Sequence, residues 1–201
     1  MDSGFIISAF KKNQFPFPDR PEIAFSGKSN VGKSSLINVL VNRKKLAKTS
    51  SRPGRTQSIN FFYAGKDLYF VDLPGYGFAR VPLAIKKTWK KMVETYLGQR
   101  VNLAAMVLIL DIRRDLSSGD KELADWLIYY GIEIIPVLTK ADKFSRQKAK
   151  QRVSIIMNQF DKSFPYSPIV FSAKTKQGKT ELWERIENII SESESNQSPV
   201  V

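Results

Sequence analysis

Eight consecutive residues, GKSNVGKS at 27–34, fit the pattern G-x-x-x-x-G-K-[ST]. The glycines let the backbone curl with its amide groups pointing inward, and the N-terminus of a following helix adds a partial positive charge. Lys33 is then placed to reach the β- and γ-phosphates of a nucleotide, and the Ser34 hydroxyl to ligate Mg²⁺. A plain strand-to-helix turn explains the glycines but not the Lys-Ser pair beside them. The residues expected at this phosphate site are Gly27, Lys28, Ser29, Asn30, Val31, Gly32, Lys33, Ser34 and Ser35.

A second pattern, D-x-x-G, spans 72–75 at the end of an expected strand. A carboxylate that holds Mg²⁺ through water belongs at such a strand end, beside the phosphate loop, which assigns that role to Asp72. Gly75 would offer its backbone amide to the γ-phosphate and supply a hinge. Alone this pattern is weak, because Asp followed by Pro-Gly is often just a turn. Its place one strand after the phosphate loop favours the functional role.

Two further motifs, TKAD at 139–142 and SAK at 172–174, each close an expected strand. In an open parallel sheet, ligands bind beyond the carboxyl ends of the strands. Asp142 there could accept N1–H and N2–H₂ of guanine, which adenine lacks, so such a site would reject ATP. Considered alone, Asp142 fits a helix N-terminal acid equally well, but four motifs in this order favour guanine. The residues expected around the base are Thr139, Lys140, Asp142, Ser172, Ala173 and Lys174, with the Lys140 stem over one face.

Short strand-like runs alternate with helical periodicity along the chain. We expect strands at 22–26, 58–64, 68–72, 103–111, 133–139 and 167–172, and helices at 34–41, 83–98, 119–130, 146–160 and 178–191. This alternation predicts a three-layer α/β fold: a six-stranded, mostly parallel sheet with one antiparallel edge strand and helices on both faces. The domain is expected to span 22–191, after an N-terminal extension at 1–21 and before an acidic, disordered tail at 192–201.

The composition of the 201 residues excludes several kinds of chemistry. The chain contains no Cys and no His, which rules out disulfides, thiolate metal sites, the common zinc sites and a Ser-His-Asp triad. No run of about 18 apolar residues occurs, so we expect no membrane span and a cytoplasmic protein, with a monomer as the default. The net charge of +13 is large for this length and indicates a polyanionic partner, usually nucleic acid.

The expected helix at 83–98 has two different sides. Its apolar residues fall on one arc at about 3.6 residues per turn, and its lysines fall on the other. Contact with the phosphate backbone of a nucleic acid such as RNA is the specific interpretation of such a surface, and a solvated face is the alternative. The basic residues assigned to RNA contact are Lys86, Lys87, Lys90, Lys91, Arg43, Lys44, Lys45, Arg113 and Arg114.

Together, GKSNVGKS, PGRTQ, DLPGYGFA, TKAD and SAK resemble the translation-factor-related P-loop GTPases. They are most similar to the EngB (YihA/YsxC) family of bacterial ribosome-assembly GTP-binding proteins, within the TrmE-Era-EngA-EngB-septin-like group. The likeness runs over about 21–190. It implies a Ras-like P-loop NTPase fold, GTP or GDP with Mg²⁺ as ligands, and a GTPase that assists assembly of the large ribosomal subunit and thereby cell division and septation.

The same resemblance implies roles for single residues. Thr56, two residues after Gly54, would be a switch threonine that closes on Mg²⁺ and the γ-phosphate. The Ala173 amide would contact the exocyclic oxygen of guanine. Hydrolysis would then depend on Thr56, Gly75 and Lys33.

Two residues depart from the usual GTPase motifs, and a third suggests a further ligand. Tyr76 follows Gly75 where Ras-type GTPases carry a water-orienting Gln, so slow intrinsic hydrolysis is expected. Thr139 stands where the base motif usually opens with Asn, which removes one amide clamp and predicts modest affinity. Asn30 matches a position that helps to hold K⁺ in related GTPases, although bracing the loop backbone is the simpler role.

Two other functions share part of this pattern. A P-loop kinase or ATPase would use the phosphate loop but has no use for TKAD and SAK together. A nucleotide-gated RNA-binding module with negligible hydrolysis is also compatible with Tyr76.

Overall fold

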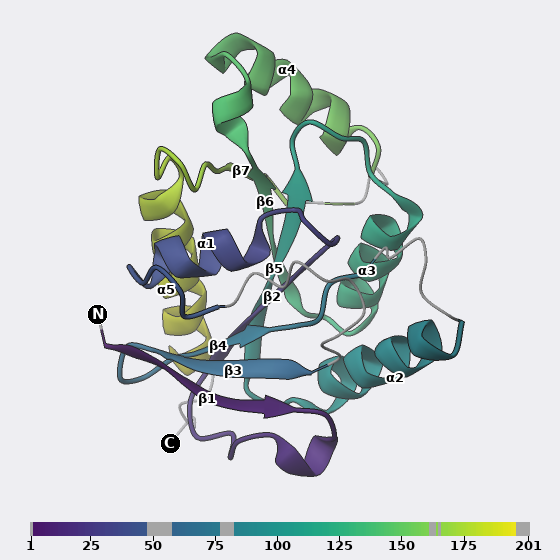
Figure 1. Cartoon of the computed structure of the whole chain (residues 1–201), viewed down its shortest axis with the longest axis vertical. Coiled ribbons are helices and arrows are strands. Elements are labelled where there is room, and N and C mark those ends of the chain that lie inside the picture. Colours follow the sequence, from purple (N-terminus) through teal and green to yellow (C-terminus); the bar gives the residue numbers. More distant parts are fainter. Residues whose placement is uncertain (1, 48–57, 77–82, 161–163, 165, 196–201) are drawn as a thin grey trace.

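The computed structural model describes residues 2–47, 58–76, 83–160, 164 and 166–195. Seven strands form one sheet in the order β1-β3-β4-β2-β5-β6-β7 (Figure 1). The strands are β1 Ser3–Ala9, β2 Glu22–Gly27, β3 Ile59–Ala64, β4 Tyr69–Asp72, β5 Leu103–Asp111, β6 Glu133–Thr139 and β7 Ile169–Val170. The helices are α1 Lys33–Leu40, α2 Leu83–Gln99, α3 Ser118–Tyr129, α4 Arg146–Met157 and α5 Lys179–Ser195, with short 3-10 turns at Lys12–Gln14 and Ala141–Lys143.

The sheet confirms the predicted α/β class but corrects its edge. Strands β4, β2, β5, β6 and β7 run parallel, and β3 is antiparallel to β4. The expectation of six strands is wrong, because β1 forms within the residues assigned to an N-terminal extension and pairs antiparallel with β3. Strand β3 is therefore second from the edge, and β1 closes that side. An edge-to-face contact between Phe5 and Phe62, with ring centres 5.8 Å apart, supports the pairing.

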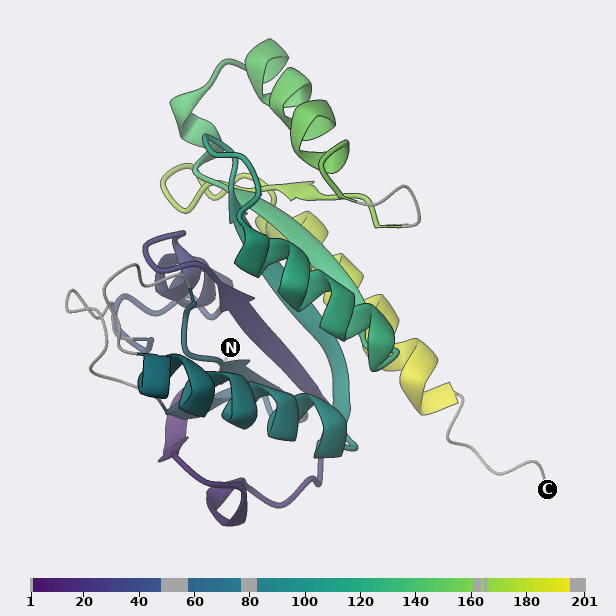
Figure 2. The same cartoon turned by 90° about the vertical axis from the view of Figure 1, so that its right-hand side faces the viewer.

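Helices cover both faces of the sheet because the strands are apolar on both faces. Along β5, Met106, Leu108 and Leu110 pack toward α2, α3 and α4, whereas Val107 and Ile109 pack toward α1 and α5. This alternation follows the two-residue repeat of a strand. Figure 2 looks onto α2 and α3, with α5 behind the sheet. The predicted three layers are confirmed.

The C-terminal helix is longer than its sequence pattern indicated. Helix α5 continues to Ser195, four residues beyond the expected domain end at 191 and into the segment expected as a disordered tail. The remaining tail residues, 196–201, lie outside the described part of the chain. Across the described ranges, no helix is long and apolar enough to cross a membrane.

Candidate nucleotide-binding site

The phosphate loop connects β2, which ends at Gly27, to α1, which begins at Lys33. Gly32 precedes the helix with φ 110°, a left-handed conformation that favours glycine. A Cβ atom on Gly27 would lie 2.6 Å from the Ile109 carbonyl oxygen, so a side chain at that position would displace backbone. The first amides of α1 lack acceptors within the helix, and no side chain caps its N-terminus. The loop is thus shaped to bind an anion with backbone amides.

Lys33 and Asp72 form an ion pair across this loop. Asp72 ends β4 and is paired in register with Phe25 of β2, which brings its carboxylate beside the phosphate loop. Both side chains are largely buried. Ser34 follows in the first turn of α1. The structure therefore brings the predicted phosphate-binding cation and the carboxylate together, at the start of the helix that carries Ser34.

The donor set at this point suits Mg²⁺. A hydroxyl from Ser34 and a carboxylate from Asp72 are hard oxygen donors, which this ion prefers. Within the described ranges, no group of three or more His, Cys, Asp or Glu could hold a metal by itself.

The D-x-x-G segment lies directly on the phosphate loop. The Ser29 amide donates to the Tyr76 carbonyl oxygen at 3.0 Å, and the Tyr76 amide donates to the Gly27 carbonyl oxygen at 3.4 Å. A Cβ on Gly75 would lie 3.1 Å from that same Gly27 oxygen. Gly75 can approach this closely because it has no side chain.

Tyr76 has a role that the comparison with Gln did not predict. Its side chain is buried, and its hydroxyl donates to Asp120 Oδ1 at 2.7 Å. The other oxygen, Asp120 Oδ2, accepts from the amide and hydroxyl of Ser117, both at 2.6 Å, and so caps α3. Tyr76 thus anchors the D-x-x-G segment to α3. Burial, then the charge of Asp120 and this hydrogen bond, raise the pKa of Tyr76 well above its usual value.

We expect Tyr76→Phe to lower the free energy of unfolding by about 1–2 kcal/mol at neutral pH, because a buried oxygen of Asp120 loses its donor. The raised pKa of Tyr76 adds stability that is fully present below about pH 10 and declines as pH rises above it. The variant should therefore lose less stability than wild type in alkaline solution. Urea unfolding at several pH values measures both effects, with Tyr129→Phe, an exposed ring, as the control. Identical unfolding curves at neutral pH would contradict the anchor.

Asp142, in the short turn after β6, is held by a residue from the end of another strand. Ser172 Oγ donates to Asp142 Oδ1 at 2.8 Å. The Thr175 amide lies 3.3 Å from Ser172 Oγ and donates to it, which fixes the hydroxyl. The bond from Ser172 outweighs desolvation and lowers the pKa of Asp142, so the carboxylate is ionised at neutral pH. The two motifs predicted to read the base are therefore joined.

Thr139 replaces the expected amide clamp with a hydroxyl contact. Its Oγ1 lies 2.6 Å from the Val31 carbonyl oxygen and 3.0 Å from that of Leu110, and its side chain is buried. It therefore ties the end of β6 to the phosphate loop and to β5. The modest nucleotide affinity inferred from this substitution stays a prediction.

Lys140 links the base motif to the phosphate loop a second time. Its Nζ donates to the Asn30 carbonyl oxygen at 2.6 Å and to Asp111 Oδ2 at 2.8 Å. Arg113 pairs with the same Asp111 carboxylate through two nitrogens. Burial raises the pKa of Asp111, but these hydrogen bonds outweigh it and hold that pKa well below the usual range.

This network contains one residue to which a different role was assigned and one that was not predicted as a site residue. Arg113 was assigned to RNA contact, but its guanidinium is bound to Asp111. Asp111 was not predicted as a site residue, although its position at the end of β5 matches that of Asp72 at the end of β4. An acidic residue closing a central parallel strand was the available signal.

The other predicted site residues are placed as follows. Ser35 lies in the first turn of α1, and Ala173 and Lys174 follow Ser172 in the loop before α5. Gly54 and Thr56 lie outside the described residues. Asn30 has a left-handed φ of 64°, which Asn tolerates better than most residues. The backbone conformation alone therefore accounts for an asparagine at this position. No described contact tests K⁺ binding, which stays a prediction.

The fold and the site together define a P-loop GTPase. A family model described as "50S ribosome-binding GTPase" matches residues 22–140. The crystal structure of a probable GTP-binding protein engB superposes with a TM-score of 0.69 at 26% identity, covering 85% of this chain and 99% of that one.

Two sequence relatives narrow the class to a family. The probable GTP-binding protein EngB of Geobacter metallireducens is 51% identical over 91% of this chain and 89% of its own length. That of Bacillus velezensis is 46% identical over 94% of this chain and 97% of its own. The chain belongs to the EngB family of GTP-binding proteins, and its activity is GTP hydrolysis. The kinase alternative is not favoured.

Proposed function

We propose that this chain is a GTP-controlled switch that binds the large ribosomal subunit during its assembly, through the phosphate backbone of ribosomal RNA. The description of the matching family model, 50S ribosome-binding GTPase, supports the partner. The observation that carries the RNA contact is the set of exposed lysines on α2, the first described element after the D-x-x-G segment. A net charge of +13 supports an RNA partner over a neutral one.

In this proposal the nucleotide site controls the α2 surface. Asp142 selects guanine, Lys33 neutralises the β- and γ-phosphates, and Ser34 holds Mg²⁺, with Asp72 acting through water. Gly75 and Thr56 respond to the γ-phosphate, so the segment that leads into α2 differs between the GTP and GDP states. Because Tyr76 occupies the position of the water-orienting Gln and its hydroxyl is bound to Asp120, intrinsic hydrolysis is slow.

The α2 lysines are not equivalent. Lys90 donates to Glu122 of α3 at 2.8 Å and lies 4.6 Å from the centre of the Trp126 ring, so it is held against α3. Lys87 and Lys91 are exposed, and the side chain of neither has a hydrogen-bond or ion-pair partner among the described residues. The side chain of Lys86 lies outside the description. Lys87 and Lys91 are therefore the lysines of α2 best placed for RNA.

Replacing Lys87 and Lys91 together by Glu should weaken binding to purified 50S subunits at least tenfold in moderate salt, and should flatten its dependence on salt concentration. GDP affinity should not change, because neither residue belongs to the nucleotide site. Binding is measured by co-sedimentation with GDP or a GTP analogue over a salt series. Lys12→Glu with Lys66→Glu, two exposed lysines near the β1 edge, is the charge-matched control. Equal loss in the control would show a general charge effect and contradict the α2 surface.

A further inference from the structure

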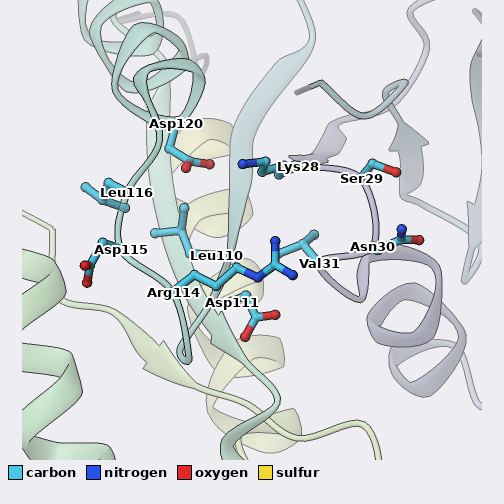
Figure 3. Close-up of a pocket in the computed structure, with 10 residues that line it drawn as sticks. All are labelled: Lys28, Ser29, Asn30, Val31, Leu110, Asp111, Arg114, Asp115, Leu116 and Asp120. Atoms are coloured by element: carbon cyan, nitrogen blue, oxygen red, sulfur yellow. The ribbon is translucent and has the colours of Figure 1, made fainter. Parts of the chain in front are cut away.

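A cleft lies on the outer side of the phosphate loop (Figure 3). One wall is the loop segment 28–31, and the other is the connection from β5 to α3, with residues from 110 to 120. Its empty volume, which is open to solvent, is about 410 Å³.

The acidic residues of the cleft already have partners. Asp111 is bound to Arg113 and Lys140. Asp115 is bound at 3.0 Å by both Arg152 and Gln159. Both oxygens of Asp120 accept hydrogen bonds, as described for the Tyr76 anchor. Asp111 and Asp115 are thus neutralised, and only Asp120 keeps an unbalanced negative charge.

The basic residues of the cleft are in the opposite situation. The side chains of Lys28 and Arg114 have no hydrogen-bond or ion-pair partner anywhere in the described ranges. In Figure 3 the Arg114 guanidinium reaches toward the phosphate loop, and the Lys28 ammonium points toward the α3 side of the cleft. Because basic side chains already neutralise Asp111 and Asp115, Lys28 and Arg114 exceed the remaining negative charge of Asp120. Two unpaired cations across a shallow cleft favour an anion.

We propose that Lys28 and Arg114 together bind one phosphate group of the ribosomal RNA backbone. This inference rests on the proposed function and adds a contact point to it. Arg presents a planar fork of donors to phosphate oxygens, and Lys adds a point charge. The same helix, α3, contacts both regions, because Asp120 lines the cleft and Glu122 pairs with Lys90 of α2.

The test uses the full chain and purified 50S subunits. Arg114→Gln, Lys28→Gln and the double variant are compared with Lys66→Gln, which removes one exposed charge in the β3–β4 turn. Because Lys28 belongs to the phosphate loop, GDP and GTP-analogue affinities are measured for each variant, and subunit binding is measured at saturating analogue. The quantity recorded is the slope of log affinity against log salt concentration.

The slope is negative, and each single variant should reduce its magnitude by about 0.7–0.9, the value for one phosphate contact. When the salt concentration is raised fourfold, the loss of affinity should therefore be about threefold smaller in the variant than in wild type. The double variant should reduce the magnitude of the slope no further, because both side chains hold the same phosphate. Lys66→Gln should match wild type. Wild-type slopes in Arg114→Gln would overturn this site and leave the proposed function intact. Additive slopes in the double variant would overturn the shared phosphate, and failure of the wild-type chain to bind 50S subunits would overturn both proposals.

Discussion

The Asp142→Asn protein should bind GDP about a thousandfold more weakly than wild type and should gain affinity for xanthosine diphosphate. In the proposed site the carboxylate accepts two hydrogen bonds from guanine, and an amide would leave at least one donor of the base facing another donor. Xanthine carries an oxygen where guanine carries its amino group, so it suits the amide. Titration of fluorescent GDP, XDP and ADP measures all three affinities.

Ser172→Ala is the matched control for this prediction. It keeps the carboxylate but removes the hydroxyl that donates to Asp142 Oδ1 at 2.8 Å. We expect GDP affinity to fall by roughly tenfold, the loss of about one charged hydrogen bond, with no gain for XDP. Unchanged guanine selectivity in Asp142→Asn would contradict the assignment of the base site, and tight ADP binding by wild type would favour an ATPase.

Lys33→Ala should reduce GDP and GTP affinity by at least a hundredfold, because the ammonium group that neutralises the β- and γ-phosphates is removed. The same change should destabilise the nucleotide-free protein by about 1–3 kcal/mol, since the buried Asp72 carboxylate loses its cation. Isothermal titration measures the first effect and urea unfolding the second.

The double variant Lys33→Ala with Asp72→Ala separates these two effects. Removing both members of the pair should restore much of the stability, because no unpaired charge remains buried. It should not restore nucleotide binding. A double variant no more stable than Lys33→Ala, or Lys33→Ala with wild-type GDP affinity, would show that this ion pair does not have the role assigned here.

Local pattern was sufficient for the central strands and the phosphate loop. Strands β5 and β6 begin and end at the predicted residues because each is a continuous β-rich apolar run closed by a polar motif. Strand β1 was missed because its pairing partner β3 lies more than 50 residues away, and its short apolar run was not enough to predict a strand alone.

The hydrogen bonds between side chains of the site could not be predicted as well from the sequence. The motifs select the residues that we expect to face the nucleotide, because phosphate and guanine chemistry fixes residue types and spacing. The bonds that hold those residues in place join segments far apart: Tyr76 with Asp120, and Lys140 with Asp111. Such pairings depend on how strands and helices pack, and no spacing rule within one segment encodes them. This is why Tyr76 was interpreted only as an absent Gln.

The Thr139 and Lys140 contacts have a consequence for the kinetics of nucleotide exchange. Through them the loop that grips phosphate and the loop that reads the base are cross-linked by the protein itself, at Val31 and at Asn30. Binding of a nucleotide then costs little conformational entropy in these loops, because folding has already ordered them. The base and the phosphates of the nucleotide would then contact one rigid unit of the protein. A displacement of the loop at the guanine end would therefore also move the loop at the phosphate end. An external partner that pulls on either loop could therefore loosen the whole nucleotide at once.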